Sequence, residues 1–289
     1  MTRAGPIAAI ALFFLVLWYA GAIALNAPQV LDLWSRDGTQ WTTMDLIDAC
    51  WNMKRAVLPT PHQIVADLYD TIFNYALDDE RHRNLLYHAG VTASSTVLGF
   101  AIGLAIGVVL AVGIVHLRTL ESSMMPWVIA SQTIPILAIA PMVVVILGNM
   151  GFTGVFPKAM ISAYLCFFPI TIGLVKGLRS VDPLALDLMR TYSATQGQVF
   201  WRLRLPTAMP FLFASLKVGV AISLVGAIVA ELPTGGVAGL GARLLTGSYY
   251  GQTVQIWSAL VMAAVLSLVL VGGVGIAQRM IVGRSGGPA

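Results

Sequence analysis

The sequence predicts an all-α protein that crosses a membrane about six times. Hydrophobic residues make up 57% of the 289 residues, charged residues make up only 10%, and the mean hydropathy is +0.82. A water-soluble domain needs far more charge, so this composition is typical of an integral membrane protein. Several apolar stretches also reach the roughly 20 residues that an α-helix needs to cross a bilayer.

The composition and the metal-binding residue types exclude other classes of protein. The pI near 9.2 does not indicate a nucleic-acid partner, because the few charges are scattered as in the basic loops of membrane proteins. Cys50 and Cys166 have no metal-ligand spacing, so they predict neither a metal site nor a disulfide. His62, His82 and His88 also lack such spacing, and we interpret them as solvated or hydrogen-bonded structural residues.

Residues 1–27 are expected to form the first transmembrane helix. Their apolar stretch is longer than the roughly 7–15 residues of a signal-peptide core. Residues 28–89 are more polar, with Trp34, Trp41 and Trp51 among acidic side chains. Tryptophan often anchors in the lipid headgroup layer, so we expect this segment to lie on the extracytoplasmic surface of the membrane.

Residues 90–282 are expected to form the core domain. The first span of this core, at about 90–115, carries Gly99, Gly103 and Gly107 at a spacing of four residues. Small residues at this spacing let two helices approach closely in lipid. The seam could be an interface that moves during function, but ordinary packing inside one subunit is the favoured interpretation.

The next span, at about 125–148, contains Pro126, Pro135 and Pro141. Each proline disturbs the backbone hydrogen bonding, which a membrane tolerates only where protein or water satisfies the freed carbonyl groups. We therefore expect this span, with Pro135 and Pro141, to line a translocation path.

The second half of the core is expected to contain spans at about 155–177, 208–230 and 254–278, an outer loop at 231–252 and a tail at 283–289. Six spans place both termini on one side of the membrane. The positive-inside rule assigns that side to the cytoplasm. Lys or Arg occupies positions 3, 118, 176, 179, 190, 202, 204, 279 and 284 there, whereas the short outer loops carry only Lys158 and Arg243.

Lys217 is the charged residue that lies deepest in a predicted span. An ionisable side chain inside the membrane indicates a functional site by default, and an amine that faces the path could attract an anionic solute. Alternatively, Lys217 reaches to the cytoplasmic interface or belongs to a structural ion pair, and this is the favoured interpretation.

Residues 180–206 are the longest polar interruption in the second half of the chain. Asp182 is suited to cap a first short helix. Leu184, Leu188 and Tyr192 then recur every four residues and form one apolar stripe. A short helix cannot bury such a stripe by itself, so the stripe either docks into another protein or lies on the lipid headgroups.

A second short helix is predicted in the same segment. Thr195 and Gln198 form the capping-box pattern that opens it. Pro206 is expected to end it, because the residue before a proline is biased away from the helical conformation.

The stretch from Asp187 to Pro206 resembles the EAA loop of bacterial ABC importer permeases. That pattern is Glu-Ala-Ala, three residues, Gly, nine residues, an aliphatic residue, one residue and Leu-Pro, often with Gly-Ala-Ser-x-x-Gln-x-Phe at its centre. Ser193 replaces the usual glycine, where a left-handed backbone would strain a serine. The residues expected to contact an ATPase are Asp187, Leu188, Met189, Tyr192, Ser193, Ala194, Thr195, Gln198, Phe200, Leu203 and Pro206.

The resemblance extends over roughly residues 56–282. The stretch 58–62 is similar to the Leu-Pro-Ser-Pro stretch of sulfonate, taurine and nitrate importer permeases. Glu231 is similar to the glutamate of the family's Ala-Glu pair ahead of Gly-Leu-Gly, and we interpret it as fixing loop geometry rather than binding solute. The resemblance implies an ABC importer permease fold in the bacterial inner membrane.

The resemblance also implies a function and a set of partners. The chain is expected to be the permease of an ATP-driven importer for a small polar or anionic solute of the sulfonate, taurine, nitrate or pyrimidine/thiamine-precursor type. Its expected partners are a cytoplasmic ABC ATPase dimer, a second permease subunit that is identical or different, an extracytoplasmic solute-binding protein and membrane lipid.

The chain itself is expected to be non-catalytic and to hold no cofactor. It has no phosphate-binding GxxxxGK[ST] loop, so ATP and magnesium belong on the partner ATPase. A secondary transporter or channel is the alternative, but it would typically bring more charge into the membrane and an internal repeat. A membrane-embedded enzyme would need a cluster of catalytic side chains, and the predicted spans contain none.

Overall fold

The computed structural model describes residues 4–38, 40–74, 83–233 and 238–282. Within these ranges all regular secondary structure is helical. The chain forms two compact units: unit 1 comprises residues 1–89 and 242–263, and unit 2 comprises residues 90–241 and 264–289. Five of the described helices are long and apolar enough to cross a membrane, and a bent helix pair is a sixth candidate. The predicted fold class is therefore confirmed.

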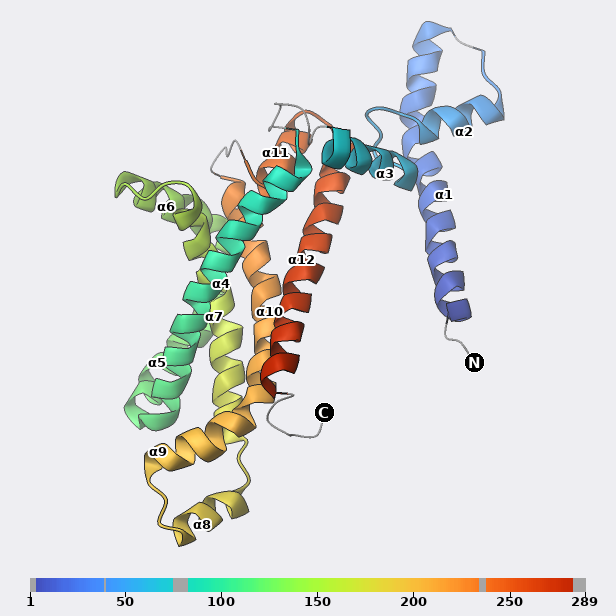
Figure 1. Ribbon diagram of the computed structural model, residues 1–289. Helices are drawn as coiled ribbons and strands as arrows, with labels where there is room; N and C mark the ends of the chain where they lie inside the picture. The colour runs from blue at the N-terminus through green and yellow to red at the C-terminus, as the bar shows by residue number, and fades with distance from the viewer. Residues whose placement is uncertain (1–3, 39, 75–82, 234–237, 283–289) are drawn as a thin grey trace. The chain divides into compact units, whose positions relative to one another are not determined.

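Unit 1 is built around the long helix α1 (Ala4–Asp37), beside which lie α2 (Thr43–Trp51) and α3 (Pro61–Tyr69) (Figure 1). The π-helical turn η1 (Asp70–Asn74) continues α3. Most of α11 (Leu240–Tyr249) also belongs to this unit.

Helix α1 does not end at residue 27, where the sequence predicted the end of the first span. Pro28 lies inside the helix and removes one backbone donor, but its neighbours Asn26 and Val30 are buried and keep the helix in place. The Asn26 amide donates to the carbonyl oxygens of Cys50 and Leu58, at 3.0 Å each. Its oxygen accepts from the backbone N–H of Leu58 at 3.1 Å, so this side chain ties the segment after α2 to α1.

Helix α11 lies in the stretch that the sequence predicted as an outer loop. Gly241 and Gly247 lower the helix propensity of this stretch and mask its helical pattern. Gly247 is needed for packing, because a Cβ there would lie 2.7 Å from Ile256 Cγ1. Tertiary packing therefore overrides local propensity in this helix.

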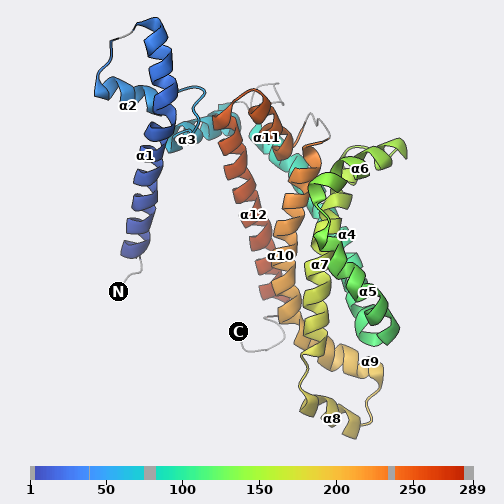
Figure 2. The same cartoon turned by 180° about the vertical axis from the view of Figure 1, so that it is seen from behind.

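Unit 2 is a bundle in which α7 (Val155–Arg179) packs against both α4 (Leu85–His116) and α10 (Leu205–Glu231) (Figures 1 and 2). The second half of α12 (Thr253–Val282) also packs on α10, where Val274 and Ala277 contact the buried Phe213 and Leu216. Unit 2 thus holds the core of four long helices in the described part of the chain.

The glycine seam of α4 faces α7. A Cβ on Gly99 would lie 2.3 Å from Ser162 Cβ, and a Cβ on Gly103 would lie 2.2 Å from Cys166 Sγ. Both distances are too short for any side chain, so the two helices approach closely only because these positions are glycine. The seam joins two helices of one chain, which confirms the favoured interpretation of ordinary packing inside a subunit.

The predicted straight span at 125–148 is instead a broken helix pair. Helices α5 (Arg118–Ala130) and α6 (Ile136–Asn149) are bent by 102° at a break that contains the 3-10 turn η2 (Ser131–Thr133). Ile134 precedes Pro135, and both residues are extended, with ψ of 124° and 113°. The residue before a proline avoids the helical conformation, whereas Pro126 and Pro141 lie inside their helices without ending them.

Candidate functional site

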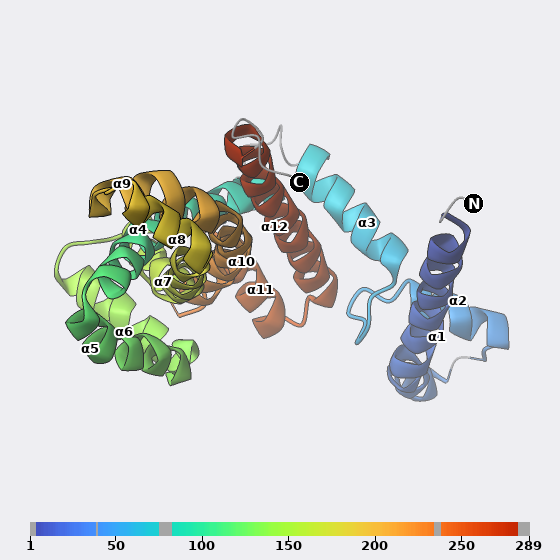
Figure 3. The same cartoon turned by 90° about the horizontal axis from the view of Figure 1, so that it is seen from below.

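The 180–206 hairpin projects from the end of unit 2 where α7 ends and α10 begins (Figures 1 and 3). It contains α8 (Pro183–Thr191) and α9 (Gln196–Val199), followed by the π-helical turn η3 (Phe200–Arg204). The Asp182 side chain accepts from the N–H of Leu184 at 2.9 Å and caps α8. The Thr195 hydroxyl and the Gln198 amide form the reciprocal capping box of α9. Both predicted caps are confirmed.

The turn between α8 and α9 is a Schellman motif with a serine in the left-handed position. Ser193 has φ of 51°. Its N–H donates to the carbonyl of Arg190 at 2.9 Å, and the N–H of Ala194 donates to the carbonyl of Met189 at 3.0 Å. This position normally takes glycine, because a Cβ is strained there. Ser193 therefore keeps the turn that the pattern requires and carries its strain.

We expect Ser193→Gly to stabilise the hairpin locally by about 1 kcal/mol, because it removes the Cβ from a left-handed residue. Hydrogen exchange of the backbone amides in residues 183–199 should then slow about fivefold. Ala194→Gly is the matched control, since Ala194 has no positive φ and a glycine there only adds entropy to the unfolded chain. Equal or faster exchange in Ser193→Gly would show that the turn is not strained.

The apolar stripe of α8 is exposed along its whole length. The exposed fractions are 77% for Leu184, 56% for Leu188 and 77% for Tyr192. Such an apolar row on a polar segment marks a surface for a protein or a membrane. The ion pair between Asp187 and Arg190, at 2.9 Å on the same exposed helix, contributes little.

The structure places every predicted ATPase-contact residue on this one hairpin or at its junction with α10. Asp187, Leu188, Tyr192, Ser193, Thr195, Gln198 and Pro206 are exposed, and Met189, Ala194, Phe200 and Leu203 are half-buried. Phe200 differs in role from the others. It packs against the buried cluster that includes Leu174 and Leu178, and its ring lies 5.2 Å from that of His116 at the end of α4.

Pro206 does not end the second helix, contrary to the sequence prediction. Helix α9, the turn η3 and α10 follow one another without a break, and the whole of Gln196–Glu231 forms one candidate span. Pro206 lies in the first turn of α10, directly after the π turn. The N–H of Leu205 donates to the carbonyl of Phe200 and closes the π turn, so the hairpin continues into α10 as one helical path.

An ion pair that the sequence analysis missed joins α5 to α7 near the hairpin. Arg179, the last residue of α7, donates from Nη1 and Nη2 to the two carboxylate oxygens of Glu121 at 2.8 Å each. A planar two-point contact of this kind fixes orientation as well as distance. The hairpin end of α7 is thereby tied to α5.

The structure does not bring the predicted path residues together. Pro135 and Pro141 are exposed on α6, which packs against Ala230 at the far end of α10. Lys217 lies on α10 about 20 Å from Ala230 along the helix axis. Its side chain is half-buried beside α12, and a Cβ added to Gly275 would lie 3.9 Å from its Cε. Within the described ranges Lys217 makes no hydrogen bond or ion pair, so its function stays a prediction.

Glu231 is fully buried at the end of α10 and collects donors from several elements. Both of its oxygens accept from the Thr92 hydroxyl of α4 at 3.0 Å. Oε2 also accepts from the N–H of Gly241 at 2.8 Å. The ammonium group of Lys158, in the first turn of α7, lies 3.7 Å from Oε1. Lys158 is therefore a buried partner of Glu231. The prediction that Lys158 lies in a short outer loop is wrong.

The loop after α10 is shaped around this carboxylate. Gly239 has φ of 129°, and a Cβ there would lie 2.2 Å from Glu231 Cδ. The N–H of Leu240 donates to the Thr92 hydroxyl at 2.8 Å, and Lys158 donates to the carbonyl of Ala238 at 3.2 Å. These contacts agree with the interpretation that Glu231 fixes loop geometry.

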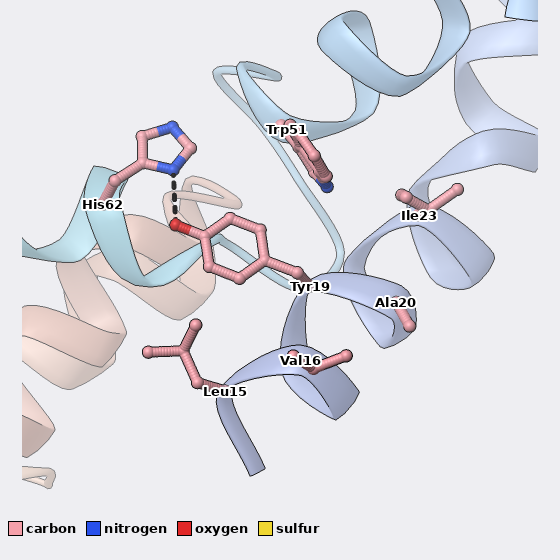
Figure 4. A pocket seen from close by; sticks show the side chains of 7 residues that line it. All are labelled: Leu15, Val16, Tyr19, Ala20, Ile23, Trp51 and His62. Atoms are coloured by element: carbon pink, nitrogen blue, oxygen red, sulfur yellow. Dashed lines mark hydrogen bonds between the residues drawn. The ribbon is translucent and has the colours of Figure 1, made fainter. Parts of the chain in front are cut away.

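A separate pocket of about 690 Å³ lies on α1 in unit 1 (Figure 4). It is lined by Leu15, Val16, Tyr19, Ala20, Ile23, Trp51 and His62. The Tyr19 hydroxyl and His62 Nδ1 are hydrogen-bonded at 3.1 Å, and His62 Nε2 lies 3.3 Å from Asn52 Oδ1. The interpretation of His62 as a hydrogen-bonded structural residue is confirmed. The pocket walls are apolar and suit hydrocarbon better than a polar solute.

The other predicted histidines have different surroundings. His88 is buried, with its ring 5.6 Å from that of Tyr87, and His82 lies outside the described residues. In the part of the chain that the structure describes, no three His, Cys, Asp or Glu side chains come together to hold a metal ion.

The chain is similar in sequence to membrane components of transport systems. The model of the family described as "Binding-protein-dependent transport system inner membrane component" matches residues 103–285. A probable ABC transporter permease protein of Haemophilus influenzae is 30% identical over 65% of this chain and 76% of its own length. The formylaminopyrimidine transport permease protein ThiX of Halalkalibacterium halodurans is 30% identical over 61% of this chain, a segment that spans 65% of ThiX.

Three further similarities concern one more distant relative and two solved structures. The putative aliphatic sulfonates transport permease protein SsuC of Bacillus subtilis is 26% identical over 73% of this chain and 71% of its own length. An amino acid ABC transporter solved with histidines has a TM-score of 0.54 at 14% identity, covering 69% of this chain and 93% of that one. The inward-facing methionine transporter MetNI gives 0.52 at 20% identity, covering 69% and 94%.

Proposed function

The chain belongs to the family of binding-protein-dependent transport system inner membrane components, and from this premise we propose that it is the permease subunit of an ATP-driven importer. The importer moves a small polar or anionic solute of the sulfonate, taurine, nitrate or pyrimidine/thiamine-precursor type into the cytoplasm. The named relatives act on different solutes, so the proposal is limited to this class.

One observation carries the proposal: the exposed apolar stripe on the capped 180–206 hairpin. Helix α8 lies between two candidate spans and outside both, the two caps fix the helices of the hairpin, and the stripe has no partner surface within the described part of this chain. We infer that the stripe docks into a cytoplasmic ABC ATPase, which binds ATP and magnesium. Two such ATPase subunits and a second permease, identical or different, complete the membrane complex.

The contacts of the hairpin suggest how ATP binding moves the spans. Closure of the two ATPases draws the docked hairpins together. The movement reaches α10 through the continuous helix at Leu205, and reaches α4 and α7 through the packing of Phe200. Arg179 and Glu121 then carry it to α5. The spans open alternately to the two sides and release a solute delivered by an extracytoplasmic binding protein.

The proposed orientation follows from this arrangement. The hairpin side carries most of the basic residues and is assigned to the cytoplasm of a bacterial inner membrane. An even number of spans would assign both termini to that side as well, and the Glu231 cluster, at the other end of α10 from the hairpin, is assigned to the outer side. Lys217 stays a candidate for attracting an anionic solute along the path.

The test is reconstitution in lipid vesicles. The tagged chain should co-purify with an ATPase, and vesicles that contain both should take up taurine, nitrate or a formylaminopyrimidine only with ATP and a matching binding protein. Vesicles without the ATPase are the control. Uptake that the chain performs alone, down a solute gradient and without ATP, would contradict the proposal and support a secondary transporter or channel.

A further inference from the structure

The break between α5 and α6, residues Ser131–Thr133, lies beside Tyr164 of α7. The Tyr164 hydroxyl of α7 donates to the carbonyl of Ser131 and fixes the break at that height. At 1.5 Å per residue, Tyr164 lies about 13 Å from the Val155 end of α7 and about 22 Å from its Arg179 end. The hydrocarbon core of a bilayer is about 30 Å thick, so the break is well inside it.

The break is polar although the residues beside it, at 127–130 and 136–140, are apolar. Ser131 and Thr133 donate from their hydroxyls to carbonyls of the preceding turn, at 2.7 and 2.8 Å. Gln132 is exposed, and its Nε2 reaches only the neighbouring Ser131 hydroxyl, at 3.4 Å. Its Oε1 accepts no hydrogen bond from the residues that the structure describes. The nearby Trp127 is 73% exposed and matches a lipid environment.

A bilayer cannot hold this segment against hydrocarbon at low cost. An amide without partners loses several kcal/mol on transfer from water to hydrocarbon. Irregular backbone at this depth is tolerated only where protein covers it or where it lines a water-filled cavity. Ile134 and Pro135 are extended, and Pro135 has no N–H to donate to the carbonyl of Ser131, which accepts from the Tyr164 hydroxyl instead.

We propose that the break lines the aqueous solute path at the middle of the membrane, and that Gln132 and Thr133 are its solute-contacting residues. This inference rests on the proposed transport function and adds the position at which the transported solute is contacted. The Gln132 amide offers its Oε1 as an acceptor and the Nε2 donor that does not reach Ser131, and the Thr133 hydroxyl, which donates to Ala130, offers accepting lone pairs. The break itself carries no charge, so it recognises hydrogen-bonding groups of a small solute. Tyr164 is a positioning residue.

The first experiment measures access from water with a small sulfonate probe. Gln132→Cys and Thr133→Cys are reacted, in vesicles that hold the whole transporter, with 2-sulfonatoethyl methanethiosulfonate. Matched controls are Trp127→Cys on α5 and Val145→Cys on α6, both exposed apolar positions that should face lipid. The wild-type chain is the blank, because Cys50 and Cys166 are fully buried.

The two break positions should react at least about tenfold faster than the two controls, because a thiol in hydrocarbon ionises less and each unit of raised pKa lowers the thiolate about tenfold. Equal rates at all four positions would overturn the inference. Slow reaction in the whole transporter but fast reaction in the isolated chain would also overturn it, since another subunit would then cover the break.

The second experiment measures solute contact. Gln132→Leu keeps the size of the side chain and removes its hydrogen bonds. The wild type is first offered taurine, nitrate and a formylaminopyrimidine to find the solute that it transports. Uptake of that solute at low concentration should fall about three- to tenfold in the variant. Ile134→Leu is the control. Unchanged uptake in Gln132→Leu would remove Gln132 from the path. Gln132→Cys and Thr133→Cys chains that react fast with the reagent but bind no ATPase would refute the proposed function and leave the aqueous break intact.

Discussion

Leu188→Asp and Tyr192→Asp are each expected to abolish co-purification of the ATPase and ATP-driven transport. Both side chains belong to the exposed stripe of α8. If the stripe docks into a protein groove, the new carboxylate loses its water without gaining a partner, and the loss of several kcal/mol exceeds what a contact of this size offsets. A stripe that lies on lipid would give a weaker effect, because the long helices still hold the chain in the membrane.

The controls for this prediction keep the stripe apolar. Leu188→Met and Tyr192→Phe preserve the contact area and should retain the ATPase, since volume-conserving exchanges cost little. The measurements are the amount of ATPase recovered with each tagged variant and the transport-coupled ATP hydrolysis in vesicles. Normal values for both Asp variants would show that the hairpin is not the coupling element.

Local patterns predicted this hairpin well because its structure is set by neighbours in the sequence. Capping by Asp182 and by Thr195 with Gln198 depends on side chains within three residues. The left-handed turn at Ser193 was implied only by the resemblance to the EAA loop, and the serine there argued against it. The spans were predictable for a similar reason, since each is a long apolar run. The ends were less predictable: α1 passes Pro28 because distant residues bury Asn26.

The features that the sequence analysis missed depend on contacts between distant residues. Lys158 was expected in a loop because the reach of α7 and the burial of its first turn are invisible in a linear pattern. Its partner Glu231 follows 73 positions later, on another helix. The break at Ser131–Thr133 was hidden because the prolines were read as loosening one span, whereas only Pro135 has an extended residue before it. Sequence alone gives no signal that separates these prolines.

The Glu231 cluster is expected to dominate the stability of unit 2. Glu231→Ala leaves the Lys158 ammonium buried without its counter-charge, and it also leaves the Thr92 hydroxyl and the N–H of Gly241 without their acceptor. Breaking a buried pair by removing one partner costs about 3–5 kcal/mol. The variant should therefore yield little folded protein, with a clear fall in the thermal unfolding temperature in detergent.

The control for Glu231→Ala is Glu121→Ala, which breaks the ion pair of Glu121 with Arg179. That pair is 35–44% exposed, so solvent screens it and its loss should lower the unfolding temperature far less. The double variant Lys158→Met with Glu231→Gln removes both buried charges and keeps an oxygen for Thr92 and Gly241, so it should recover most of the stability that Glu231→Ala loses. Equal unfolding temperatures for Glu231→Ala and Glu121→Ala would mean that water reaches the cluster and that Glu231 does not hold together the ends of α4, α7 and α10 that meet there.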